Sequence, residues 1–187
     1  HYSISRLAER LSNLGGRPVV VFDVETNGLS ARQSVLSIAA LKYRYEPESS
    51  GLVHIDTLSR YYFSRERENP KALRVNGLSK DIIAENRANA SYPPYFDEDW
   101  DVAEFFSGSG LVVAHNVDFD KKFLRVFPRL EGLNFFCTMK SNGGYRKLVD
   151  MARSLHIEVD CNSLHGSMYD ARLAASVLQE LIYKMYM

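Results

Sequence analysis

The sequence predicts an α/β fold in which a mixed β-sheet is flanked by α-helices. The first part of the chain has the pattern of successive β-strands, and the rest alternates short apolar strands with helical patterns. A length of 187 residues suits one domain with a sizeable core. Because 45% of the residues are hydrophobic and 25% are charged, the chain is typical of globular proteins, not of disordered, collagen-like or coiled-coil ones.

The N-terminal part is expected to hold one helix and three strands. Residues 4–14 place apolar side chains at helical spacing and end at a Gly-Gly pair, which favours a helix stop. Residues 19–25 are dense in β-branched side chains, as in a strand buried on both faces. Residues 35–45 and 57–63 follow as strands around the turn-rich residues 46–51, so we predict an antiparallel meander of three strands.

The C-terminal part is expected to alternate helices with two short strands. The apolar runs at 111–114 and 135–136 are interpreted as the fourth and fifth strands of the sheet. Helical periodicity predicts helices over residues 81–88, 100–106, 120–127, 145–155 and 167–186. We therefore expect a single domain over residues 1–187, with an N-terminal helix in 1–16 and the core in 17–187.

The formal net charge of zero hides an uneven distribution. Residues 1–80 and 121–187 each carry a net +4, whereas residues 81–120 carry −8. At face value the overall balance argues against a nucleic-acid-binding protein, which usually has a basic excess, but the zero is a cancellation between two basic segments and an acidic centre. No apolar stretch approaches the roughly 20 residues of a membrane span, so no membrane partner is expected. Two cysteines without metal-ligand spacing, and no visible signal peptide, favour a cytoplasmic location.

Two acids, Asp23 and Glu25, stand at the end of the first predicted strand. Since they are two residues apart, their carboxylates project from the same face of the strand. Neighbouring carboxylates near a buried sheet repel each other, and a divalent cation such as Mg²⁺ or Mn²⁺ would offset that repulsion. The alternative is a strand end that emerges into solvent with both acids simply exposed.

A second polar cluster, residues 114–120 (Ala-His-Asn-Val-Asp-Phe-Asp), follows the fourth predicted strand. Strands of open α/β sheets deliver functional groups from their C-terminal ends, so these side chains are candidates for a site. The alternative is structural, since Asp118 or Asp120 could cap a helix that begins near Lys121.

A third cluster, residues 165–170 (His-Gly-Ser-Met-Tyr-Asp), opens the last predicted helix. Ser167 and Asp170 fit a capping box, which is a purely structural explanation for Asp170. His165 lies in the preceding loop, where an imidazole could act as a general base, although a lone histidine is more often a surface residue.

Taken in order, the three clusters resemble the motifs of the DEDDh, or DnaQ-like, family of 3′–5′ exonucleases. That family includes the proofreading epsilon subunit of bacterial DNA polymerase III and stand-alone relatives. The matching segments are residues 22–29 (Phe-Asp-Val-Glu-Thr-Asn-Gly-Leu), 115–120 and 165–170, and the likeness extends from about residue 19 to residue 181.

The resemblance implies a ribonuclease H-like fold and a two-metal active site. Asp23, Glu25, Asp120 and Asp170 would bind two divalent cations, Mg²⁺ or Mn²⁺, and His165 would take a proton from the attacking water. By the same likeness, the substrate-binding residues would be Thr26, Gly28, Leu29, His115, Asn116 and Phe119. Core packing remains an alternative for Leu29 and Phe119.

The implied function is a 3′–5′ exonuclease that acts at the 3′ end of nucleic acid, with single-stranded DNA favoured over RNA, and releases nucleoside 5′-monophosphates. The alternatives are an RNA-trimming 3′–5′ exoribonuclease of the same family and a non-catalytic module that binds nucleic acid or a polymerase. A DNA polymerase is a further candidate partner. Residues 91–104 are more acidic and aromatic than the family pattern leads us to expect, and they could form either a helix start with favourable charges or a partner surface.

Overall fold

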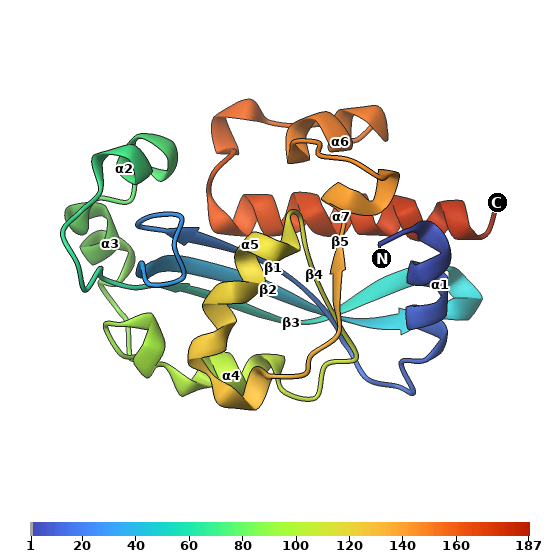
Figure 1. The fold of residues 1–187 in the computed structure, drawn as a ribbon, viewed down its shortest axis with the longest axis horizontal. Coiled ribbons are helices and arrows are strands. Elements are labelled where there is room, and N and C mark those ends of the chain that lie inside the picture. Colours follow the sequence, from blue (N-terminus) through green and yellow to red (C-terminus); the bar gives the residue numbers. More distant parts are fainter. Residues whose placement is uncertain (1) are drawn as a thin grey trace.

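A five-stranded mixed sheet lies between helices in the computed structural model, which describes residues 2–187 apart from the side chain of Asn142 (Figure 1). The strand order is β3-β2-β1-β4-β5. The antiparallel meander consists of β1 (Val19–Thr26), β2 (Val35–Glu46) and β3 (Gly51–Tyr61). Strand β4 (Leu111–Ala114) pairs in parallel with β1, and β5 (Phe135–Cys137) pairs in parallel with β4. The predicted fold class is therefore confirmed.

The helices form two layers and one end group around this sheet (Figure 1). One face packs against α1 (Ile4–Ser12), α6 (Leu148–Ser154) and α7 (Ser167–Met185). The other packs against α4 (Trp100–Phe106) and α5 (Val117–Asp120), which continues as a 3₁₀ turn over Lys121–Val126. Helices α2 (Pro70–Asn76) and α3 (Lys80–Asn86) lie beyond the end of β1.

Some predicted boundaries differ from the structure. Strand β3 begins at Gly51, before the predicted residue 57, because the first half of this edge strand has no buried residue and therefore no alternation of buried and exposed side chains to reveal it. The helix predicted over 120–127 starts at Val117, and the one predicted over 145–155 starts at Leu148. Helix α2 was not predicted: it is capped by Asn69 and ended by Gly77, but it has no buried residue and therefore no apolar periodicity.

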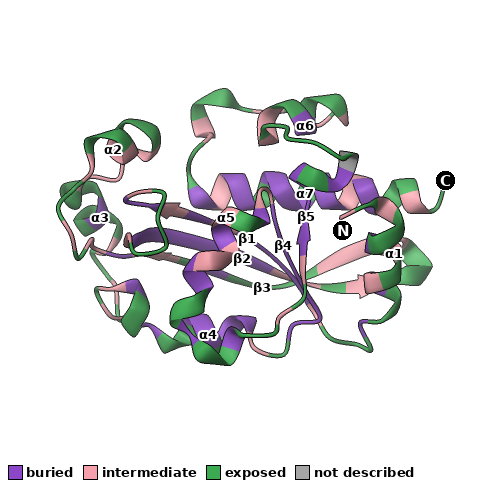
Figure 2. Cartoon of the chain, viewed as in Figure 1, coloured by how far each residue is buried: buried purple, intermediate pink, exposed green. Residues whose placement is uncertain are grey.

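The alternation of side chains along β1 decides where its acids point. Val20, Phe22 and Val24 belong to the core under α4 and α5, whereas Val19 and Val21 belong to the core under α7. Figure 2 shows that β1 is mostly buried between these helices. Asp23 and Glu25 continue the second series, because side chains two residues apart share one face of a strand. They therefore project toward the start of α7. The pairing of β1 with β2 shifts register between Glu25 and Thr26, so the regular strand ends directly after the second acid.

The acidic segment 91–104 is neutralised by arginines of this chain. Arg60 on β3 contacts Asp99 and Asp101 at 2.9 Å, and the buried Asp99 also accepts a hydrogen bond from Tyr62 at 2.7 Å. The remaining ion pairs join Arg65 to Asp97 and Glu98, and Arg129 to Glu104. Asp99 is also the N-cap of α4, so the interpretation as a helix start is confirmed, and these ion pairs give the segment a structural role.

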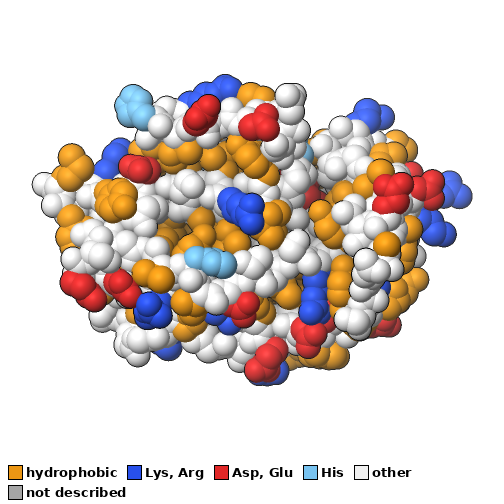
Figure 3. Space-filling view, turned by 180° about the vertical axis from the view of Figure 1, so that it is seen from behind, with side chains coloured by type: hydrophobic (Ala, Val, Ile, Leu, Met, Phe, Trp, Pro, Cys, Tyr) orange, Lys and Arg blue, Asp and Glu red, His pale blue; other side chains and the backbone are white. Residues whose placement is uncertain are grey.

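Positive and negative side chains are interspersed on the face turned away in Figure 1 (Figure 3). Over the described part of the chain, none of the helices is both long enough and apolar enough to cross a membrane.

Candidate active site

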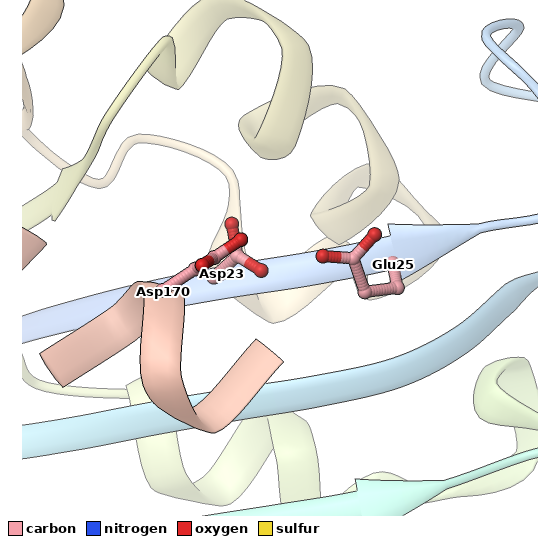
Figure 4. Close-up of side chains that lie close together, drawn as sticks. All are labelled: Asp23, Glu25 and Asp170. Carbon is pink, nitrogen blue, oxygen red and sulfur yellow. The ribbon is translucent and has the colours of Figure 1, made fainter. Parts of the chain in front are cut away.

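Three carboxylates meet at the C-terminal end of β1. Asp23 and Glu25 come from the strand and Asp170 from the first turn of α7, and each offers one oxygen within 4.8 Å of the others. In Figure 4, Asp23 and Asp170 lie close together and Glu25 lies further along the strand. The prediction that Asp23 and Glu25 share a face is confirmed. The alternative of two simply exposed acids is wrong, because both are half-buried.

Asp120 lies beside these three acids but is oriented by a different contact. It is the buried last residue of α5, and its Oδ1 accepts a hydrogen bond from the backbone N–H of Val24 at 3.3 Å. The charge of Asp120 also raises the pKa of both Asp23 and Glu25, which places it in the same electrostatic site. The capping alternative is wrong for Asp120, because its side chain makes no capping hydrogen bond to the 3₁₀ turn that begins at Lys121.

Burial raises the pKa of each acid in this group, and repulsion from neighbouring acids adds to this effect for Asp23, Glu25 and Asp120. Burial is the largest cause for Asp23, followed by the charges of the other three acids. Burial and the charge of Asp170 raise the pKa of Glu25 to about 8. Burial also raises the pKa of Asp120 to about 8 and that of Asp170 to about 6, against the opposing effect of backbone hydrogen bonds. Four such acids cannot all be ionised at neutral pH without a compensating positive charge.

The acid group has the properties of a divalent-cation site. The Oδ2 atom of Asp23 is buried and has no hydrogen-bond partner, which is unfavourable for a carboxylate oxygen. A cation would satisfy that oxygen, and carboxylates are the ligands that Mg²⁺ and Mn²⁺ prefer. Asp23, Glu25 and Asp170 are therefore the residues that could hold a metal ion, with Asp120 next to them.

His165 is held beside Asp170 by the backbone. Its N–H lies 3.2 Å from both carboxylate oxygens of Asp170, and its φ of 69° is in the left-handed region, which is uncommon for a residue with a side chain. The charge of His165 also lowers the pKa of Asp170, and the residue is exposed. The capping box is wrong, because Gly166 is the N-cap and Asp170 receives its hydrogen bond from His165.

Thr26, Gly28 and Leu29 lie where β1 enters the 27–34 loop, which connects β1 to β2. The hydroxyl of Thr26 donates to the carbonyl of Gly28 at 2.6 Å. Leu29 is 79% exposed, so core packing is wrong for this residue. A Cβ at Gly28 would lie 2.7 Å from Cγ of Gln33, so packing within the loop also accounts for the glycine. The structure thus brings these three residues to the same end of β1 as the acids.

His115, Asn116 and Phe119 lie at the junction of β4 and α5. Both ring nitrogens of His115 are engaged, Nδ1 with the hydroxyl of Thr138 at 2.8 Å and Nε2 with the carbonyl of Arg146 at 2.6 Å. Burial lowers the pKa of His115, which favours its neutral form. Phe119 is half-buried and packs against the core, so the core-packing alternative is supported for this ring.

Two polar residues near the site were not singled out by the sequence. Asn27 is only 2% exposed, and its side chain contacts Glu66, which lies on the segment between β3 and α2. In the sequence, Asn27 has the features of an ordinary turn residue. No local pattern around Glu66 indicates its role, because the contact joins positions 39 residues apart.

The model of the RNase_T family, described as exonuclease, matches residues 20–178. The DNA polymerase III subunit epsilon of Rickettsia conorii is 27% identical over 180 residues, covering 87% of this chain and 73% of that protein. PolC-type DNA polymerase III of Bacillus cereus is 25% identical over 178 residues, covering 87% of this chain, which spans only 11% of the polymerase.

Two solved structures share the fold. A structure described as Exonuclease X in complex with 5′ overhanging duplex DNA has a TM-score of 0.66 at 20% identity. The match covers 90% of this chain and 93% of the chain in that structure. A full-length 3′-exonuclease has a TM-score of 0.63 at 14% identity, and covers 90% of this chain and 61% of its own. The predicted ribonuclease H-like fold is thereby confirmed. With the family match extending over most of its length, the chain belongs to the RNase_T family of exonucleases, and its resemblance to the DEDDh 3′–5′ exonucleases is confirmed.

Proposed function

We propose that this exonuclease domain is metal-dependent and hydrolyses phosphodiester bonds at the 3′ end of single-stranded DNA, releasing nucleoside 5′-monophosphates. The observation that carries the proposal is the convergence of Asp23, Glu25 and Asp170 within 4.8 Å, in a chain that belongs to an exonuclease family. The unpaired buried oxygen of Asp23 supports a cation at this place.

The acids, the histidine and the loop have distinct roles in this proposal. Asp23, Glu25 and Asp170, with Asp120, hold two Mg²⁺ or Mn²⁺ ions, which when bound supply charge stabilisation at the reacting phosphate. His165 is exposed beside Asp170, where its ring can accept the proton of the attacking water. The exposed Leu29 offers an apolar surface to an unstacked base of the 3′-terminal nucleotide.

The remaining substrate contacts are proposed from their positions near the acids. Thr26 approaches the terminal nucleotide from the end of β1 and Gly28 from the 27–34 loop. His115, Asn116 and Phe119 do so from the junction of β4 and α5. The choice of DNA is supported by the relatives, which are DNA polymerase III proteins, and by a solved structure with a similar fold that is described in complex with duplex DNA. The same relatives support a DNA polymerase as a partner.

A degradation assay on 5′-labelled single strands tests the proposal. We expect a ladder that shortens from the 3′ end with Mg²⁺ or Mn²⁺, and no degradation with a chelator. Degradation rates on DNA and RNA oligomers of the same sequence show which sugar the enzyme prefers. A preference for RNA above about tenfold would replace the DNA proposal with RNA trimming. A strand that stays intact for hours with either metal, together with binding of the strand and no metal-dependent thermal shift, would indicate a non-catalytic binding module.

The variant Asp23→Ala is the matched control for the chemistry. We expect it to abolish activity while the folded state is retained, because it removes a metal ligand and no apolar core contact. Circular dichroism checks the fold, and a thermal shift with Mn²⁺ checks metal binding. Full activity in this variant would contradict the assignment of Asp23.

A further inference from the structure

The 27–34 loop is fastened to residues 64–69, the segment that leads from β3 into α2. The amide of Asn27 donates to Oε2 of Glu66 at 2.8 Å and to the carbonyl of Arg67 at 2.9 Å. Its Oδ1 accepts a hydrogen bond from the backbone N–H of Asn69 at 2.9 Å. The start of the loop is therefore tied to this segment through one buried side chain.

Glu66 also holds the other end of the loop. Its Oε2 accepts a hydrogen bond from the backbone N–H of Ser34 at 3.0 Å, and its Oε1 accepts one from the hydroxyl of Ser34 at 2.8 Å. The two ends meet directly as well, since the N–H of Asn27 donates to the carbonyl of Ser34 at 2.9 Å. One carboxylate thus joins the first and last residues of the loop.

The carboxylate of Glu66 is suited to this position in its ionised form. Partial burial acts to raise the pKa of Glu66, but hydrogen bonds from Ser34, Asn27 and Ser64 outweigh that effect and hold the pKa below its ordinary value. An ionised carboxylate has only acceptors and can receive several N–H and O–H donors together. Residues 29–32 in the middle of the loop are exposed, so these polar contacts provide much of the order of the loop.

We propose that Glu66 is a positioning residue for the 3′-terminal nucleotide, which it serves by holding the 27–34 loop in the shape that presents Gly28 and Leu29. The proposal rests on the proposed function, because it requires that this loop contact the substrate. Glu66 is not one of the acids that meet at β1. Its loss therefore loosens substrate binding, since the loop must then be ordered at the expense of binding energy, and leaves the hydrolytic step unchanged.

Steady-state kinetics on a 5′-labelled single strand with Mn²⁺ test this separation. We expect Glu66→Ala to raise KM about tenfold with kcat within about twofold of wild type. Glu66→Gln should stay within about threefold of wild type in KM, because its amide oxygen can accept from Asn27 and Ser34 N–H while its NH₂ donates to the Ser34 hydroxyl. Ser34→Ala, which removes one of these contacts, serves as a milder variant should Glu66→Ala fail to fold, and we expect a rise in KM of about two- to threefold.

The matched control is Glu68→Ala, an exposed acid in the same segment, for which KM and kcat should be unchanged. A second readout is competitive inhibition by a nucleoside 5′-monophosphate, which should weaken in Glu66→Ala by the same factor as KM. The thermal shift with Mn²⁺ should be equal in all folded variants.

An unchanged KM in both Glu66→Ala and Ser34→Ala, or a fall in kcat with unchanged KM, would overturn the role of Glu66. This outcome is distinct from failure of the proposed function, because in that case the wild-type protein itself would leave the strand intact.

Discussion

The substitution Glu25→Gln is expected to stabilise the metal-free protein at neutral and alkaline pH. The folded structure raises the pKa of Glu25 from an ordinary 4.5 to about 8. The stability that depends on protonated Glu25 is fully present below pH of about 4.5, where the carboxyl group is neutral in the folded and the unfolded state. This stability is lost as the pH rises toward about 8. At pH 8 the ionised form is penalised by roughly 4 kcal/mol. Since Asp23 and Asp170 share this interaction, we expect the substitution to recover about 1–3 kcal/mol.

Thermal unfolding in a chelator measures this effect. For a chain of this size, the expected gain corresponds to an increase in Tm of about 3–10 °C at pH 8, which disappears below pH of about 4.5. The control Glu131→Gln changes an exposed acid and should have little effect. Added Mn²⁺ should stabilise the wild type more than Glu25→Gln, because the variant has lost a ligand. A variant that unfolds below the wild type at pH 8 in chelator would refute the electrostatic reasoning.

Two further predictions concern His165 and Asp99. In single-strand degradation assays, we expect His165→Gln to lower kcat by about 10²–10⁴-fold with little change in KM. The Mn²⁺-dependent thermal shift should also change little. A kcat within about threefold of wild type would exclude the general-base role. We expect Asp99→Ala to cost about 3–5 kcal/mol of unfolding free energy in urea, because it leaves the Arg60 guanidinium and the Tyr62 hydroxyl without their buried acceptor, and a loss below about 1 kcal/mol would show that the contact is replaced by solvent.

The sequence predicted those parts of the site that depend on local spacing. The convergence of Asp23 and Glu25 follows from the two-residue period of a strand, and the buried run of valines before them identified that strand. Asp170 and His165, at the start of the last helix, were assigned from the joint order of the three clusters and its resemblance to the family motifs. The direction of Asp120 was not predictable, because it depends on a hydrogen bond to Val24 on a strand 96 residues away.

The difference between local sequence patterns and tertiary contacts also explains which elements of the fold were predicted wrongly. Helix α2 has caps at both ends but no buried face, so hydrophobic periodicity had nothing to detect. The first half of the edge strand β3 has no buried residue, and its length is set by pairing with β2. The role of Glu66 depends wholly on tertiary contacts with Asn27 and Ser34. Charge neutralisation of segment 91–104 required knowledge of where three distant arginines lie.

The register shift after Glu25 separates two parts of the chain that can diverge independently. An insertion or deletion of one residue within β1 would exchange the acids for their neighbours on the opposite face, and would remove the proposed metal ligands. The same change within the 27–34 loop begins beyond the regular strand and leaves Asp23 and Glu25 in place. Length variation in this loop is therefore a route by which such a domain can change its specificity for the end of the substrate strand while it keeps the same proposed hydrolytic centre.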